Sequence, residues 1–173
     1  MKRSVWGIIV LILVGAKANA GYSGDGFSLG YGQSNEGINI YRTGLQREFE
    51  SRWFESSTGY LSGYFELSYN LWNKSGENTH GVALSPVFVY FFDKGKRSWV
   101  PYAEAGIGMA LIDDYQIHGR DLSTHFQFED RAGFGACIHP FDLNFRYMHY
   151  SNASITKTND GIDIWLGTFS WYF

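Results

Sequence analysis

Three residues near the end of the chain carry side chains that together catalyse hydrolysis in many enzymes. His149 and Ser151 stand two residues apart, and Asp163 follows after a polar segment. A serine hydroxyl is a weak nucleophile until a base takes its proton, and a third group has to orient that base. Residues two apart in a strand share a face, so a strand here would place His149 beside Ser151. Asn152, next to the serine, offers an amide donor to an oxyanion.

The spacing of a histidine and a serine is by itself a weak signal, and the alternative is a chance pair of polar residues at a membrane interface. Their position favours function. Both continue an alternating apolar stripe that consists of Phe141, Leu143, Phe145 and Tyr147. Polar side chains on a lipid-facing stripe are costly unless they sit at the interface or perform a function.

A second acid competes with Asp163 for the histidine. If His139-Pro140 closes a tight hairpin, Ile138 faces Phe141 and Asp130 faces His149. Asp130 is then an additional candidate for orienting the base. The alternatives are that Asp130 pairs with Arg131 or marks a β-bulge.

Eight strand-like segments surround these residues. They are Phe27–Ser34, Ile38–Phe49, Gly59–Trp72, Gly81–Phe92, Trp99–Ile112, His125–Ile138, Phe141–Ser151 and Asp163–Phe173. Most approach the roughly 9–11 residues that cross a bilayer as a tilted strand. Apolar residues alternate with polar or small ones, and aromatic residues are abundant, which is typical of an all-β, eight-stranded antiparallel transmembrane β-barrel. A soluble β-sandwich is the alternative fold.

The N-terminus has the features of a secretory signal peptide. Lys2 and Arg3 precede an apolar run, and Ala18-Asn19-Ala20 is a small-x-small cleavage site. We therefore expect residues 1–20 to be removed and residues 21–173 to form one barrel domain. Without the signal peptide, 11 basic residues face 17 acidic ones, which argues against nucleic-acid binding.

The connectors and strand number predict where the candidate site lies. With an even number of strands both termini are periplasmic, so His149, Ser151 and Asp163 reach the extracellular end. By strand parity the first two open to the membrane, and a lipid substrate would approach sideways along outward residues such as Tyr147 and Trp165. The terminal Phe173 resembles the sorting signal of outer-membrane barrels.

Other titratable residues give weaker signals. The remaining histidines show no shared metal-ligand spacing, so no metal or other cofactor is expected. Five inward residues are expected to form a polar network in the lumen: Glu66, Glu104, Glu129, Arg131 and Arg146.

Two short motifs resemble a known family. His149-Tyr150-Ser151-Asn152-Ala153, followed by Asn159-Asp160-Gly161-Ile162-Asp163, is similar to the signature of the PagL family of outer-membrane lipid A 3-O-deacylases. The similarity extends to the length, the strand count and the aromatic ending. The family usually carries glutamate where this chain has Asp163. Aspartate is one methylene shorter, so its carboxylate has to lie closer to His149 or bond to it through water.

The resemblance implies a serine esterase of the Gram-negative outer membrane that removes the 3-hydroxyacyl chain at position 3 of lipid A without a metal. Ser151 would be the nucleophile, His149 the base, Asp163 the orienting acid and Asn152 an oxyanion contributor. The expected partners are lipopolysaccharide and membrane lipid, and a homodimer stays open. The rival interpretations are a structural or adhesive barrel and an acyltransferase barrel, which would take its acyl donor into the lumen.

Overall fold

Antiparallel strands make up the regular structure of the computed structural model, which describes residues 24–93 and 98–173. The predicted signal peptide lies outside these residues. The strands are β1 (Asp25–Ser34), β2 (Asn39–Glu48), β3 (Trp53–Ser56), β4 (Gly59–Lys74), β5 (Glu77–Phe91), β6 (Val100–Ile112), β7 (Gln116–Ile117), β8 (Arg120–Asp121), β9 (Phe126–Ile138), β10 (Phe141–Ser151) and β11 (Ile162–Tyr172). The described residues include no helix of the length and apolar character needed to cross a membrane.

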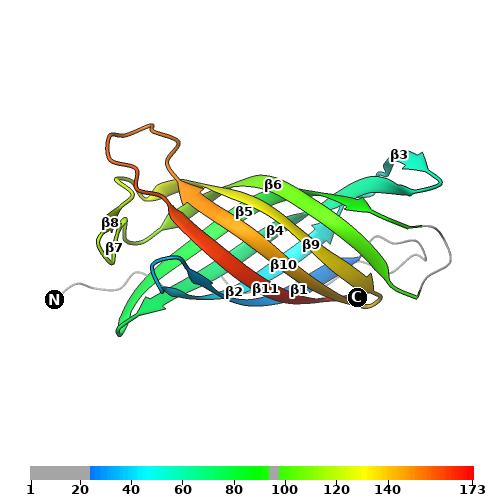
Figure 1. The fold of residues 1–173 in the computed structure, drawn as a ribbon, viewed down its shortest axis with the longest axis horizontal. Helices are drawn as coiled ribbons and strands as arrows, with labels where there is room; N and C mark the ends of the chain where they lie inside the picture. The colour runs from blue at the N-terminus through cyan, green and yellow to red at the C-terminus, as the bar shows by residue number, and fades with distance from the viewer. Residues whose placement is uncertain (1–23, 94–97) are drawn as a thin grey trace.

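Eight of these strands form a closed barrel (Figure 1). Their order around the wall is β2-β1-β11-β10-β9-β6-β5-β4, and pairing of β2 with β4 completes the ring. The predicted eight-stranded antiparallel barrel is therefore confirmed. One end of the barrel holds Asp25 and Phe173 and is called the terminal end; the other, which holds the β7–β8 hairpin and the loop after β10, is called the loop end (Figure 1).

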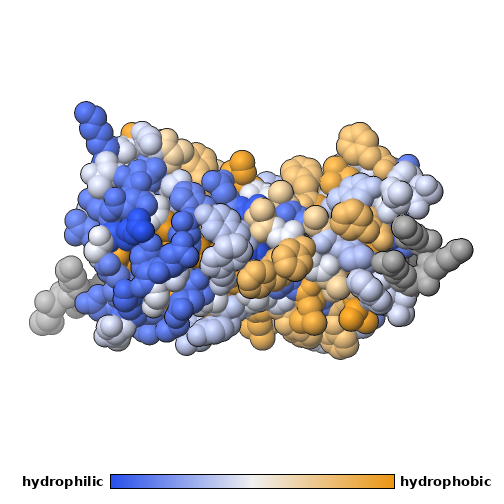
Figure 2. Space-filling view, in the orientation of Figure 1, coloured by the Kyte–Doolittle hydropathy of each residue, from blue (hydrophilic) through white to orange (hydrophobic). Residues whose placement is uncertain are grey.

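Alternation along the strands separates an apolar outer wall from a polar lumen. In β4, Phe65, Leu67 and Tyr69 are exposed, whereas Glu66 and Ser68 between them are buried. Apolar side chains gather over the middle and the terminal end of the outer surface, and hydrophilic ones over the loop end (Figure 2). An apolar band of this kind matches the hydrocarbon region of a bilayer.

Buried ion pairs fill the middle of the lumen. Arg42 bonds to Glu66 at 2.7 Å and to Glu129 at 2.8 Å, and Arg131 lies 3.0 Å and 2.5 Å from the same two carboxylates. Arg146 pairs with Glu104 at 3.2 Å. Charges removed from water need such partners, and this inward network confirms the five residues predicted for it. Arg42 is a sixth member that the sequence analysis did not single out.

An apolar cap closes the lumen toward the loop end. It joins inward residues of the barrel strands with Ile117 and Leu122 from the β7–β8 region. Its other members include Ile38, which directly precedes β2, and the strand residues Ile40, Trp72, Ile112, Met148, Ile162, Ile164 and Leu166. Together, the ion pairs and this cap leave the described lumen packed between its middle and the loop end.

Three connectors differ from the expected loops. The segment Glu50–Thr58 contains β3, which pairs with the start of β4, and the segment Asp113–Thr124 contains the β7–β8 hairpin. The polar stretch 73–79 is mostly strand, because β4 and β5 extend to a two-residue turn at Ser75 and Gly76. Both turn residues have positive φ, 53° and 86°, as this hairpin type requires. Polar composition indicated loops here, but hairpins that project beyond a membrane also carry polar side chains.

Candidate functional site

The strand register places His149 between two acids on the outer wall. On one side its Cα partner is Asp163 of β11, and on the other it is Asp130 of β9. The expected pairing of Ile138 with Phe141 across the β9–β10 turn is also present. Directly paired residues share a face, so the histidine and both carboxylates point outward together.

His149 bonds to Asp163. The imidazole Nδ1 lies 2.6 Å from the Asp163 Oδ1, and each side chain is 35% exposed. Aspartate is one methylene shorter than the glutamate usual in the resembling family, yet it reaches the imidazole directly, because the two residues are paired across β10 and β11. Asp130 lies at the paired position on the other side, so both acids flank the base and Asp163 holds the hydrogen bond.

The Tyr147 hydroxyl is an additional partner of this acid. It donates to Asp163 Oδ1 at 2.5 Å, the oxygen that also contacts His149. The sequence analysis treated Tyr147 only as part of the outward apolar stripe. The signal that could have identified the contact is its diagonal position relative to Asp163 on one face, a separation that a long aromatic side chain can bridge.

Ser151 ends β10 on the same face as His149. It is partly exposed, and its Cα partner on β9 is Phe128. His149 and Ser151 are separated by two strand steps, or roughly 6.6 Å along the chain. Because Nδ1 of His149 faces Asp163, Nε2 is the ring nitrogen left to accept a proton from the serine.

Gly161 lies against the edge of the His149 ring that carries Nε2. A Cβ atom at this position would lie 2.7 Å from Cε1 and 3.3 Å from Nε2, and the backbone has a φ of +61°. Both the close approach and the left-handed backbone require glycine. The glycine of the Asn159–Asp163 motif therefore has a local role, which is to let the loop pass over the imidazole.

Asn152 points inward and is fully buried. Its Nδ2 donates to the Leu122 carbonyl at 2.9 Å and to Thr156 Oγ1 at 2.8 Å, and its backbone N–H donates to Asn159 Oδ1 at 3.0 Å. These bonds tie the 152–161 loop to the β7–β8 region. A role as oxyanion donor stays a prediction, and it requires Nδ2 to exchange one of these acceptors for the substrate.

Arg120 fixes the same loop from the other side. It donates to the Asp160 carbonyl at 2.8 Å and forms an ion pair with Glu36 in the β1–β2 turn. Asp160 in turn accepts a hydrogen bond from the Asp121 backbone N–H at 2.8 Å. The loop that carries Gly161 is thus held between two other connectors.

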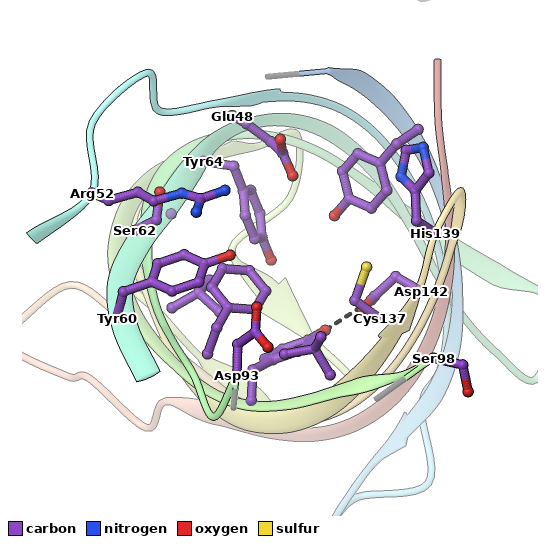
Figure 3. A pocket seen from close by; sticks show the side chains of 16 residues that line it. Glu48, Arg52, Tyr60, Ser62, Tyr64, Asp93, Ser98, Cys137, His139 and Asp142 are labelled. Atoms are coloured by element: carbon purple, nitrogen blue, oxygen red, sulfur yellow. Dashed lines mark hydrogen bonds between the residues drawn. The ribbon is translucent and has the colours of Figure 1, made fainter. Parts of the chain in front are cut away.

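A lumenal cavity of about 130 Å³ lies at the opposite, terminal end of the barrel (Figure 3). Glu48, Tyr64, Cys137 and Asp142 point into it, and Asp142 accepts a hydrogen bond from Tyr102 at 2.8 Å. The His149 cluster does not line it, and the ion pairs and the apolar cap separate the two. Among the residues that the structure describes, no three His, Cys, Asp or Glu side chains converge as a metal site would require.

Comparison with known proteins agrees with this arrangement. Residues 39–172 match the family model described as lipid A 3-O-deacylase (PagL). The lipid A deacylase PagL of Pseudomonas aeruginosa is 34% identical over 79% of this chain and 79% of its own length. The lipid A deacylase PagL of Bordetella bronchiseptica is 31% identical over 99% of this chain and 96% of its own.

A solved structure shows the same architecture. The crystal structure of the outer membrane enzyme PagL superimposes with a TM-score of 0.79 at 33% identity, covering 84% of this chain and 98% of that one. Coverage and identity of this extent cannot arise from a shared barrel shape alone. The chain therefore belongs to the lipid A 3-O-deacylase (PagL) family and is an outer-membrane β-barrel.

Proposed function

We propose that this protein is a serine esterase that hydrolyses the ester-linked 3-hydroxyacyl chain at position 3 of lipid A. The observation that carries the proposal is the 2.6 Å bond between His149 and Asp163 on the outer wall, with Ser151 two residues away on the same face. The family and the names of both relatives support lipid A as the substrate.

The proposed reaction uses Ser151 as the nucleophile. Its Oγ attacks the ester carbonyl while His149 Nε2 takes the hydroxyl proton, and Asp163 holds the imidazole through Nδ1. When the tetrahedral intermediate collapses, the sugar oxygen leaves with that proton and the acyl chain stays on the serine. A water molecule, activated by the same base, then releases the fatty acid and restores the enzyme.

The site would work at the outer leaflet. The side chains of His149 and Ser151 face away from the packed lumen, so lipid A would reach them sideways from the membrane. Trp165 lies below the cluster and packs against Phe145, with ring centroids 5.7 Å apart and planes 13° apart, and against Tyr147 at 5.1 Å. These rings form an apolar surface on which the acyl chain of the substrate would lie.

Mass spectrometry of lipid A tests the proposal directly. Cells that produce the protein are expected to lose the mass of one hydroxyacyl chain from lipid A relative to cells without it. An unchanged profile would favour the structural or adhesive barrel, and a gain of an acyl mass would favour an acyltransferase. Release of a 3-hydroxy fatty acid by the purified protein identifies the cleaved bond.

Trp165→Ala is expected to change the acyl-chain-length preference, because it removes part of the surface below the cluster. The preference is measured as relative rates on lipid A species that differ only in the length of the 3-O-acyl chain. Leu166→Ala is the matched control, since Leu166 is the next residue and is fully buried in the lumen. It is expected to lower the unfolding temperature and keep the preference; a changed preference in Leu166→Ala alone would contradict the outward placement.

A further inference from the structure

One oxygen of Asp163 receives two donors. Tyr147 Oη lies 2.5 Å and His149 Nδ1 lies 2.6 Å from Asp163 Oδ1. Asn35, in the turn after β1, donates its backbone N–H to the Asp163 carbonyl at 3.1 Å and places its Nδ2 3.5 Å from Oδ2. The acid is therefore held from β10 on one side and from the β1–β2 turn on the other.

The strand register explains how the tyrosine reaches the acid. His149 is the direct partner of Asp163, and Tyr147 is the direct partner of Trp165, so Tyr147 and Asp163 are diagonal neighbours on one face. Such neighbours are about 7–8 Å apart at Cα, a distance that a tyrosine spans and a short side chain does not. Contact with the Trp165 ring at 5.1 Å fixes the direction of the tyrosine ring.

The two donors to Oδ1 have a chemical consequence for the base. Oδ1 accepts the proton of the Tyr147 hydroxyl, so this oxygen carries no proton of its own to offer to Nδ1, 2.6 Å away. His149 must then keep its proton on Nδ1, which leaves Nε2 as the acceptor that Ser151 needs. The hydrogen bond from Tyr147 also restricts rotation of the Asp163 carboxylate, which lies directly against the imidazole.

We propose that Tyr147 is a positioning residue of the esterase, which acts through Asp163 to hold His149 in the orientation and tautomer that activate Ser151. This inference rests on the proposed function and extends it to a fourth side chain. The competing explanation is that Tyr147 serves only as an outward aromatic in contact with lipid. The two explanations require different parts of Tyr147. Packing against lipid needs only the aromatic ring, whereas positioning of Asp163 needs the hydroxyl.

Tyr147→Phe separates them, since it deletes the hydroxyl and keeps the ring against Trp165. We expect kcat for lipid A deacylation to fall about 10- to 100-fold, the scale of a displaced catalytic group, with KM unchanged. Tyr69→Phe is the matched control. Tyr69 is an exposed outward tyrosine of β4, across the barrel from β10, and its hydroxyl also contacts an imidazole, that of His80 at 2.6 Å. Wild-type kinetics are expected for this control.

Two further measurements distinguish positioning from packing. The first is the rate at which a fluorophosphonate labels the serine. In this reaction Ser151 Oγ bonds to phosphorus, fluoride leaves and His149 takes the hydroxyl proton. Tyr147→Phe is expected to slow this labelling as much as it slows kcat, whereas Tyr69→Phe, on the opposite side of the barrel, is expected to keep the wild-type labelling rate. In an Asp163→Asn background, Tyr147→Phe is expected to cause no further loss, because the group it acts through is already gone.

The outcomes separate this inference from the function on which it rests. Suppose that the wild type is active, that Ser151→Ala is inactive, and that Tyr147→Phe keeps the wild-type kcat and labelling rate. This result would overturn the positioning role and leave the proposed function standing. A full additional loss in the Asp163→Asn background would also overturn it. A wild-type protein that neither releases hydroxyacyl chains nor reacts with the fluorophosphonate would instead remove the proposed function.

Discussion

Ser151→Ala is expected to assemble as a normal outer-membrane barrel and to lose lipid A deacylation by at least about 10³-fold. Loss of the nucleophile removes the covalent step, and only binding and electrostatic contributions remain. The side chain is small, partly exposed and at the end of β10, so the barrel should tolerate the change. Activity is measured as released 3-hydroxy fatty acid at equal amounts of folded protein.

Folding has to be shown independently in this experiment. A shift in electrophoretic mobility between heated and unheated samples reports a folded barrel. Ser56→Ala, which removes an exposed hydroxyl in β3, is the matched control and should remain fully active. If a heat-modifiable Ser151→Ala barrel retained wild-type turnover, the serine mechanism would have to be abandoned.

Asp163→Asn is the second substitution for which a large effect is expected. The amide has nearly the same shape as the carboxylate but no charge, so it can no longer stabilise the imidazolium that forms when His149 takes the serine proton. Replacement of the acid in serine hydrolases lowers kcat by up to about 10⁴-fold, and we expect a loss of about 10²- to 10⁴-fold here. Asp163→Glu should retain much of the activity, because glutamate is the usual family residue at this position.

Asp130→Asn tests the alternative assignment of the acid. Asp130 is the other direct neighbour of His149, on β9, and it has the same outward orientation. The hydrogen bond from His149 to Asp163 predicts that Asp130→Asn is the milder change. Should Asp130→Asn cost more turnover than Asp163→Asn while both barrels assemble, Asp130 would be the orienting acid.

Strand parity accounts for how much of the fold could be predicted. The alternation in segments such as Gly59–Trp72 determined which side chains face lipid, and the buried Glu66 and exposed Leu67 follow it. Parity does not determine where a strand ends beyond the bilayer. Polar residues outside the membrane are in contact with water whether they belong to a strand or to a loop, so their composition is the same in both cases. For this reason the sequence did not predict β3 or the long β4–β5 hairpin.

The candidate site was predictable to the level of strand pairing. The two-residue turn after β9 determined the β9–β10 register and with it the pairing of Asp130 with His149. The pairing of His149 with Asp163 follows a long loop, so the sequence placed Asp163 only at the same end of the next strand. Side-chain contacts that depend on rotamers or on loops were not predictable. The Tyr147 bond needs a particular ring direction, and the inward bonds of Asn152 depend on a β7–β8 hairpin that no sequence pattern indicated.

The contact between Asn35 and Asp163 joins residues 128 positions apart in the chain. One belongs to the turn after the first barrel strand and the other begins the last, and the pairing of β1 with β11 brings them together. A nascent barrel with all its hairpins formed but its two ends still apart lacks this contact. The acid thus receives its complete set of partners only when β1 pairs with β11, so the geometry of the candidate site depends in part on closure of the barrel.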